Sequence, residues 1–225
     1  MKEYLNITNE CNLELMKRYK DNHFDLAIVD PPYGIERFKK CSSKDVEGAT
    51  TSKSRRIAER FFNIESANNI KPSKEYWNEL FRVSKNQIVF GANNFEMPPS
   101  EYFFCWDKQQ AMPNFATLEY AWVSMGLKKP AKLFTYSIHK HNQVNKIHPT
   151  QKPVPLYQWI LTEYAKEGWK ILDTHLGSGG IAIALDSVNK FEKMKLTLTA
   201  CELSKQHFED AIKRIESETR QESLF

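Results

Sequence analysis

The sequence predicts an α/β protein built around a largely parallel β-sheet. Short blocks of apolar residues, typical of strands buried on both faces, alternate with longer segments of helical periodicity. The blocks lie at residues 25–30, 87–92, 102–106, 170–176 and 196–201. The helical segments lie at residues 75–83, 154–166, 179–188 and 204–217. Because strands joined through helices run parallel, we expect ligands at the carboxyl ends of the strands.

The composition is that of a globular protein. The 225 residues carry a formal net charge of +4, with 27% charged and 12% aromatic residues, which argues against a disordered chain or a coiled coil. No apolar stretch approaches the length of about 18 residues that a membrane span requires, and no secretion signal opens the chain. We therefore expect a cytoplasmic protein without a membrane partner. The four cysteines are scattered and no histidine pair has metal-ligand spacing, so we expect no metal site.

The first apolar block ends in Asp30-Pro31-Pro32-Tyr33-Gly34. Two prolines cannot donate to a β-ladder, so the strand stops there and the carbonyls of Asp30 and Pro31 are left to accept hydrogen bonds. A carboxylate, a carbonyl and a nearby aromatic ring could hold an amino group and stack on the planar ring that carries it. The alternative interpretation is a Pro-Pro turn that only ends a strand.

Residues 39–60 differ from the rest of the chain. They hold few apolar side chains, many Ser and Thr, and an excess of Lys and Arg over Asp and Glu. This composition predicts a mobile basic loop directly after the first strand. A solvated surface excursion without a partner is the equally weighted alternative.

A second motif, His148-Pro149-Thr150-Gln151-Lys152-Pro153, precedes the helical segment at 154–166. Its prolines stiffen a loop that presents Thr, Gln and Lys side chains, which could bind a carboxylate or a phosphate. Residue types alone favour the alternative, a loop whose Lys and Gln face water.

The block at 170–176 runs into a third motif, the glycine-rich turn Gly177-Ser178-Gly179-Gly180. A strand, a glycine turn and a helix N-terminus form a nucleotide-type pocket, because glycines allow close approach and the helix end offers N–H groups. Glu202, about 20 residues later, ends the next strand, where it could bind ribose hydroxyls. Asp173, inside the strand, suits a ligand with a positive group, such as an amino acid moiety.

Taken as an ordered set, these segments resemble the amino-group DNA methyltransferases, S-adenosylmethionine-dependent enzymes that modify adenine N6 or cytosine N4. The resemblance rests on Asp-Pro-Pro-Tyr at 30–33, His-Pro-Thr-Gln-Lys-Pro at 148–153 and Leu-Gly-Ser-Gly at 176–179, and it extends from about Tyr4 to Ile215. A catalytic motif that precedes the cofactor motif is the order of the permuted beta class.

This resemblance implies a Rossmann-like fold of the class I methyltransferase type. The expected sheet has seven strands, is mostly parallel and carries helices on both faces, within a single catalytic domain spanning residues 1–225. The permuted order implies a strand at about 3–8 beside the strand at 196–201.

The resemblance also implies roles for individual residues. Asp30 and the Pro31 carbonyl would hold the exocyclic amine, within a turn completed by Pro32, and Tyr33 would stack on the base. The residues expected to bind S-adenosylmethionine are Asp173, Leu176, Gly177, Ser178, Gly179, Glu202, Thr150 and Lys152. Among them, Glu202 would take the ribose hydroxyls, and Thr150 and Lys152 would lie near the cofactor carboxylate. DNA contacts are expected within residues 39–146, with Lys53, Arg55 and Arg56 as candidates.

Asp rather than Ser at position 30 resembles the adenine-directed members of the family. We therefore expect methyl transfer to N6 of a flipped adenine in double-stranded DNA. The alternatives are N4-cytosine methylation, a nicotinamide-dependent oxidoreductase and a catalytically silent nucleic-acid-binding module. A homodimer and a cognate restriction endonuclease are further partners that the resemblance leaves open.

Overall fold

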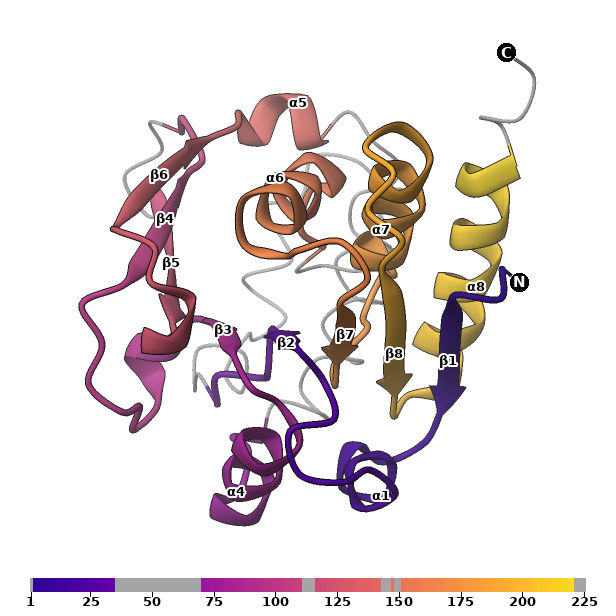
Figure 1. Ribbon diagram of the computed structural model, residues 1–225. Coiled ribbons are helices and arrows are strands. Elements are labelled where there is room, and N and C mark those ends of the chain that lie inside the picture. The colour runs from indigo at the N-terminus through magenta and orange to yellow at the C-terminus, as the bar shows by residue number, and fades with distance from the viewer. Residues whose placement is uncertain (1, 35–69, 111–115, 143–146, 148–150, 221–225) are drawn as a thin grey trace, which may run out of the picture.

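The computed structural model describes residues 2–34, 70–110, 116–142, 147 and 151–220. Its centre is an eight-stranded sheet in the order β1-β8-β7-β2-β3-β5-β4-β6 (Figure 1). The strands are β1 (Leu5–Asn9), β2 (Leu26–Val29), β3 (Gln87–Phe90), β4 (Phe103–Asp107), β5 (Leu118–Val123), β6 (Lys132–Thr135), β7 (Lys170–Asp173) and β8 (Thr197–Glu202). The α-helices are α1 (Asn12–Lys17), α4 (Lys74–Val83), α5 (Ile138–Asn142), α6 (Val154–Tyr164), α7 (Gly180–Phe191) and α8 (Lys205–Arg220).

The predicted α/β class and the mostly parallel sheet are confirmed. In the described part of the chain, β5 is antiparallel to β3 and β4, and the remaining pairings are parallel. The implied pairing of the N-terminal strand is also present, because β1 runs parallel to β8 with Leu5 opposite Leu198.

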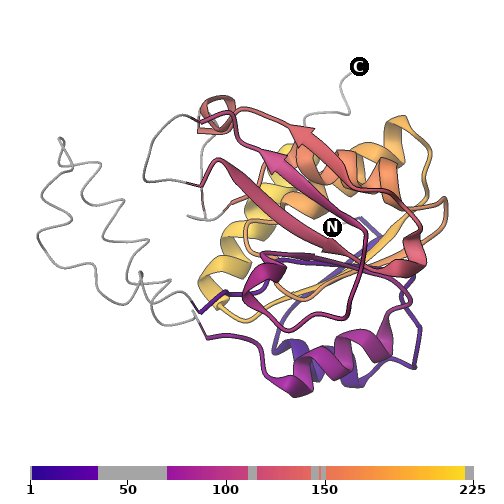
Figure 2. The ribbon, with the colours of Figure 1, turned by 90° about the vertical axis from the view of Figure 1, so that its left-hand side faces the viewer.

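The sheet has eight strands rather than the expected seven. Neither β5 nor β6 stands out as an apolar block in the sequence. Strand β5 carries Glu119 near its start, and the short edge strand β6 alternates exposed and half-buried positions. Figure 2 turns the end of the sheet formed by β4, β5 and β6 toward the viewer.

Helices cover both faces of the sheet because neighbouring strand residues point in opposite directions. Ile28 packs into the core cluster that contains residues of α6, α7 and α8, whereas Val29 packs into the cluster that contains residues of α1 and α4. In Figure 1, α1 and α4 accordingly lie together at the bottom of the view. The core is therefore two apolar layers, one on each side of the strands.

The connections place a ligand site at one edge of this sheet. Strands β1, β8, β7, β2 and β3 run parallel, so their carboxyl ends meet at the same edge. From β2 the chain continues to β3 on one side, and from β7 it continues to β8 on the other side. Such a point of divergence between adjacent strands is where open α/β sheets bind their ligands.

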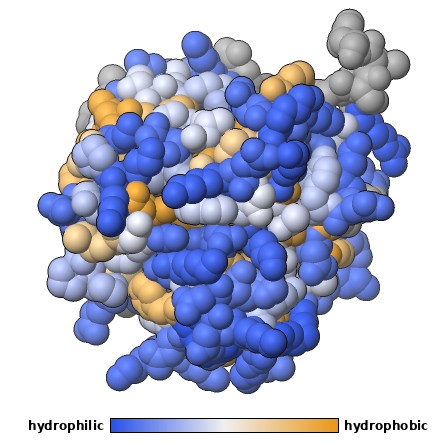
Figure 3. All heavy atoms as spheres, viewed as in Figure 1, coloured by the Kyte–Doolittle hydropathy of each residue, from blue (hydrophilic) through white to orange (hydrophobic). Residues whose placement is uncertain are grey.

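The surface is largely polar. The face drawn in Figure 3 is mostly hydrophilic, with small, separated hydrophobic patches. Among the described residues, no helix has both the length and the apolar character needed to cross a bilayer.

Candidate active site

Three predicted groups meet at the carboxyl edge of the sheet. Asp30 follows β2, the glycine turn follows β7, and Glu202 ends β8. Because β7 lies between β2 and β8, these segments are neighbours in space. The prediction that the motifs gather at strand ends is confirmed, while the roles of the individual residues remain predictions.

The turn after β2 fixes a carboxylate beside an aromatic ring. The Tyr33 hydroxyl donates a 2.7 Å hydrogen bond to Oδ1 of Asp30. Burial, followed by the charge of Asp30, raises the pKa of Tyr33, so the hydroxyl stays protonated as a donor. The ring lies edge-on to Phe95 at a centroid distance of 6.1 Å. Gly91 makes room for it, because a Cβ at position 91 would lie 2.3 Å from the Tyr33 ring.

The turn after β7 is held by hydrogen bonds to acidic side chains. The Gly177 N–H donates to Oε2 of Glu202 at 3.0 Å, and the Ser204 N–H donates to Oε1 at 2.9 Å. Gly177 and Gly179 have φ angles of 54° and 75°, in the left-handed region that favours glycine. Leu176 is buried beneath the turn, where its N–H donates to the Cys201 carbonyl at 3.0 Å. The glycine turn and Glu202 therefore form one bonded unit.

Two buried titratable groups lie at the start of this turn. Burial raises the pKa of Asp173 to about 7, although its carboxylate accepts a 2.9 Å hydrogen bond from the His175 N–H. The nearby charges of Asp30 and Glu202 raise it further. Burial lowers the pKa of His175 to about 4, so its imidazole is neutral near pH 7. The strand ends thus present carboxyl groups without a cationic histidine, which suits a ligand with a positive group.

Lys152 lies on the Asp30 side of the site. Its ammonium contacts Oδ2 of Asp30 and lies 2.6 Å from Oε1 of Glu119, on β5. The sequence analysis expected Lys152 near the cofactor carboxylate and did not single out Glu119. The signal that could have found Glu119 is a carboxylate within an otherwise apolar and aromatic stretch, residues 118–123.

Several predicted residues lie outside the described part of the chain. They are the DNA-contact candidates Lys53, Arg55 and Arg56, and Thr150. The basic loop expected at 39–60 also lies there. Among the described residues, no group of three His, Cys, Asp or Glu side chains could hold a metal ion.

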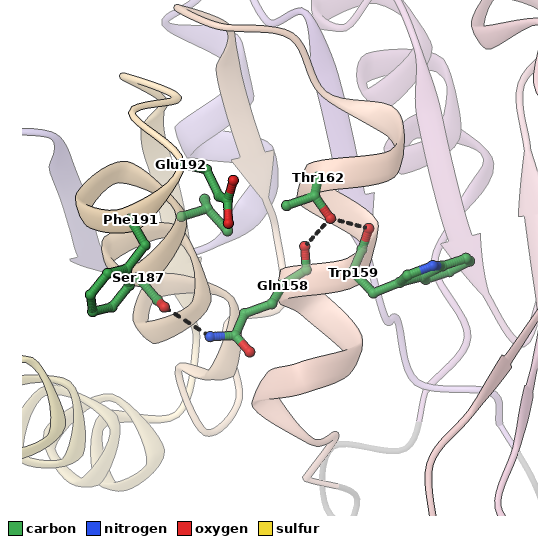
Figure 4. Close-up of a pocket in the computed structure, with 7 residues that line it drawn as sticks. Gln158, Trp159, Thr162, Ser187, Phe191 and Glu192 are labelled. Carbon is green, nitrogen blue, oxygen red and sulfur yellow. Dashed lines mark hydrogen bonds between the residues drawn. The ribbon is translucent and has the colours of Figure 1, made fainter.

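A shallow hollow of about 250 Å³ opens between α6 and α7, away from this edge of the sheet. Figure 4 shows its polar bridge, in which Nε2 of Gln158 donates to Oγ of Ser187 at 2.9 Å. Phe191 and Glu192, at the far end of α7 from the glycine turn, also line it. The hollow therefore plays no part in the strand-end site.

The fold and the strand-end motifs define an α/β enzyme of the class I methyltransferase type. Residues 70–213 match the model of the N6_N4_Mtase family, described as DNA methylase, and the chain belongs to this family of DNA amino-methyltransferases. The chain is 25% identical over 250 residues to the type II methyltransferase M2.MboI of Moraxella bovis, which covers 93% of this chain and 89% of that protein. A local match of 30% identity over 90 residues relates it to the type II methyltransferase M.HpaI of Haemophilus parainfluenzae, across 40% of this chain and 27% of that protein.

Solved structures share the fold at low sequence identity. The M1.HpyAVI–SAM complex superposes with a TM-score of 0.52 at 18% identity, covering 94% of this chain and 98% of that chain. The cytosine-N4-specific PvuII DNA methyltransferase superposes with a TM-score of 0.52 at 12% identity, covering 97% of this chain and 94% of that chain. The DNA modification methylase TTHA0409 of Thermus thermophilus, complexed with S-adenosylmethionine, gives a TM-score of 0.53 at 13% identity, covering 98% and 95% of the two chains.

Proposed function

We propose that this protein transfers a methyl group from S-adenosylmethionine to the N6 amine of an adenine in double-stranded DNA. The observation that carries the proposal is the turn Asp30–Tyr33, which joins a carboxylate and an aromatic ring beside the glycine turn. An exocyclic amine offers two N–H groups and an attached planar ring. A carboxylate, a neighbouring carbonyl and an aromatic side chain are the groups that such a target needs.

The residues around the glycine turn fit the cofactor. The left-handed conformations of Gly177 and Gly179 keep side chains away from a ligand that approaches the backbone. Asp173 would hold the amino group of the methionine end, and Glu202, whose oxygens each retain a lone pair, would hold the ribose hydroxyls. Leu176, Ser178 and Thr150 stay assigned to the same ligand. When bound, S-adenosylmethionine supplies a methyl group already activated on a sulfonium.

The amine needs alignment and polarisation, because its lone pair is delocalised into the adenine ring. The Asp30 carboxylate accepts one N–H and the Pro31 carbonyl accepts the other, which favours a pyramidal nitrogen with an available lone pair. As the nitrogen gains positive charge, the fixed carboxylate stabilises it. Pro32 keeps this turn rigid because its φ is fixed. No cysteine nucleophile is required.

The target base must leave the double helix to reach this turn. Flipping costs a few kcal/mol, which stacking on Tyr33 and contacts to the amine would offset. Lys53, Arg55 and Arg56 remain our candidates for contacts to DNA phosphates. The curated relatives are type II methyltransferases, which supports a cognate restriction endonuclease as a partner of this enzyme.

Mass spectrometry of digested DNA tests the proposal. DNA treated with the purified protein and S-adenosylmethionine should gain N6-methyladenine, and the Asp30→Asn variant, which keeps the shape of the side chain, should abolish the gain. Asp21→Asn is the matched control, because Asp21 is exposed and pairs with Arg82 far from the strand ends. N4-methylcytosine without N6-methyladenine would overturn the choice of base. The absence of both products would contradict the proposed function.

A further inference from the structure

Four charged side chains of alternating sign meet beside the turn after β2. The Lys152 ammonium contacts Oδ2 of Asp30 and lies 2.6 Å from Oε1 of Glu119. The other oxygen of Glu119 lies 2.9 Å from Nζ of Lys108. The Lys152 side chain is 4% exposed, whereas the other three are 17–19% exposed. Lys152 is thus the buried centre of the group.

The charge of Lys152 is held by its two carboxylate partners. Burial alone would lower the pKa of Lys152, but Asp30 and Glu119 raise it above its usual value, so the side chain is an ammonium. The same reasoning applies to Glu119, whose pKa is lowered by Lys152 and Lys108 despite its burial. The ammonium also lies 4.5 Å from the centre of the Phe90 ring, a favourable cation–π distance.

Other titratable groups near Asp30 come from three elements. Tyr33 belongs to the same turn, Tyr157 comes from α6, and Asp173 from β7. None of these three is a cation. In the described part of the chain, Lys152 is therefore the positive group in contact with the Asp30 carboxylate.

We propose that Lys152 and Glu119 are positioning residues for the methyl-transfer reaction. Lys152 keeps the Asp30 carboxylate ionised and oriented toward the amine. Glu119 takes up part of the Lys152 charge, so that Asp30 remains a strong acceptor instead of being neutralised by a single tight ion pair. This inference rests on the proposed role of Asp30 as the acceptor of the amine N–H.

Removing either charge should shift the acid limb of kcat, measured with saturating DNA and cofactor, in opposite directions. In Lys152→Met, two buried carboxylates face each other without a cation, so Asp30 takes up a proton at a higher pH. The acid limb should rise by about one pH unit, with kcat falling about tenfold below it. In Glu119→Gln, Lys152 is left to Asp30 alone, and the acid limb should move to a lower pH.

The double variant Lys152→Met/Glu119→Gln separates this role from a structural one. It leaves Asp30 without either neighbour, so the like-charge repulsion disappears and kcat at neutral pH should exceed that of Lys152→Met. A purely structural role predicts that the second substitution adds further damage. Glu163→Gln is the control, because Glu163 pairs with Lys129 and Lys132 on the surface and should leave the acid limb unchanged.

The outcomes distinguish the two proposals. A wild-type protein that methylates neither adenine nor cytosine contradicts the proposed function itself. An active wild type whose acid limb is the same in Glu119→Gln, or a double variant no better than Lys152→Met, contradicts the inference alone. If Lys152→Met does not fold, the direction of the shift in Glu119→Gln decides.

Discussion

Arg214, on α8, donates a 3.1 Å hydrogen bond from Nη1 to the main-chain carbonyl of Ser178, inside the glycine turn. The side chain is buried, and its Nε donates to Glu218 at 2.7 Å, which fixes the guanidinium. One turn of α8 away, Ala211 lies against Gly179, as does Ile215. The shape of the proposed cofactor turn therefore depends on a helix that begins after the next strand.

The first prediction follows from this contact. Arg214→Met keeps most of the aliphatic packing but leaves the Ser178 carbonyl without its donor, which costs about 1–3 kcal/mol for a buried group. Because the loss falls on the turn, we expect about tenfold weaker binding of S-adenosylmethionine, measured by titration calorimetry. Lys213→Met is the control, since Lys213 is an exposed neighbour on the same helix. Wild-type affinity in Arg214→Met would show that α8 does not support the turn.

A second prediction concerns Gly179, whose φ is 75° and whose missing Cβ would lie 2.7 Å from Cδ1 of Ile215. Gly179→Ala combines backbone strain with a steric clash. Gly168 provides a matched comparison, because its φ is 77° and nothing lies within 4 Å of its missing Cβ. Gly168→Ala should lower the free energy of unfolding by about 1 kcal/mol from strain alone. Gly179→Ala should lower it by at least about 1 kcal/mol more.

Urea denaturation of the two variants measures both costs. Adding Ile215→Val to Gly179→Ala removes the clashing Cδ1 methyl, so the double variant should recover part of the difference. Equal destabilisation by Gly179→Ala and Gly168→Ala would show that the contact with Ile215 carries no energetic penalty.

Motifs carried by sequence-adjacent residues could be predicted, because their local chemistry fixes their structure. The prolines after Asp30 end β2 whatever surrounds them, and the glycines at 177 and 179 allow a turn that other residues resist. A parallel sheet then brings the carboxyl ends of β2, β7 and β8 together. The gathering of Asp30, the glycine turn and Glu202 follows from these local features and the alternation of strands and helices.

Partners that meet across the sheet could not be predicted in this way. Glu119 belongs to β5, which pairs antiparallel with β3 and β4, and nothing local in the sequence specifies that order. The sequence suggested an anion partner for Lys152 but could not choose between a ligand carboxylate and the Asp30 and Glu119 carboxylates. The contact of Arg214 with Ser178 likewise depends on how α8 packs.

A third prediction concerns the pH dependence of cofactor binding. The pKa of Asp173 in the free protein is raised to about 7, so the carboxyl is largely protonated under mildly acidic conditions. A positive amino group of the cofactor requires the ionised form. The affinity for S-adenosylmethionine should therefore rise from about pH 6 to about pH 7.5, and binding should release protons in this range. Asp173→Asn should bind more weakly and lose this dependence. Calorimetry in buffers of different ionisation enthalpy measures the released protons, and a pH-independent wild-type affinity would contradict the assignment.

The last prediction uses Asp173 and His175 together, because they titrate in opposite senses. Folding raises the pKa of Asp173 from 3.8 to about 7, so the folded state holds this proton more tightly and its stability falls as pH rises through that range. Folding lowers the pKa of His175 from 6.5 to about 4, so the stability it contributes is present above 6.5 and is lost as pH falls toward 4.

In the wild type the two slopes, each at most about 1.4 kcal/mol per pH unit, largely cancel. Asp173→Asn should leave the slope of His175, so that the variant loses stability relative to the wild type on acidification from about pH 6.5 to about pH 4.5. His175→Gln should leave the slope of Asp173 and gain stability relative to the wild type over the same range. Urea denaturation at several pH values measures both differences. Differences from the wild type that do not vary with pH would show that neither group is titrated by folding as the buried positions at the end of β7 require.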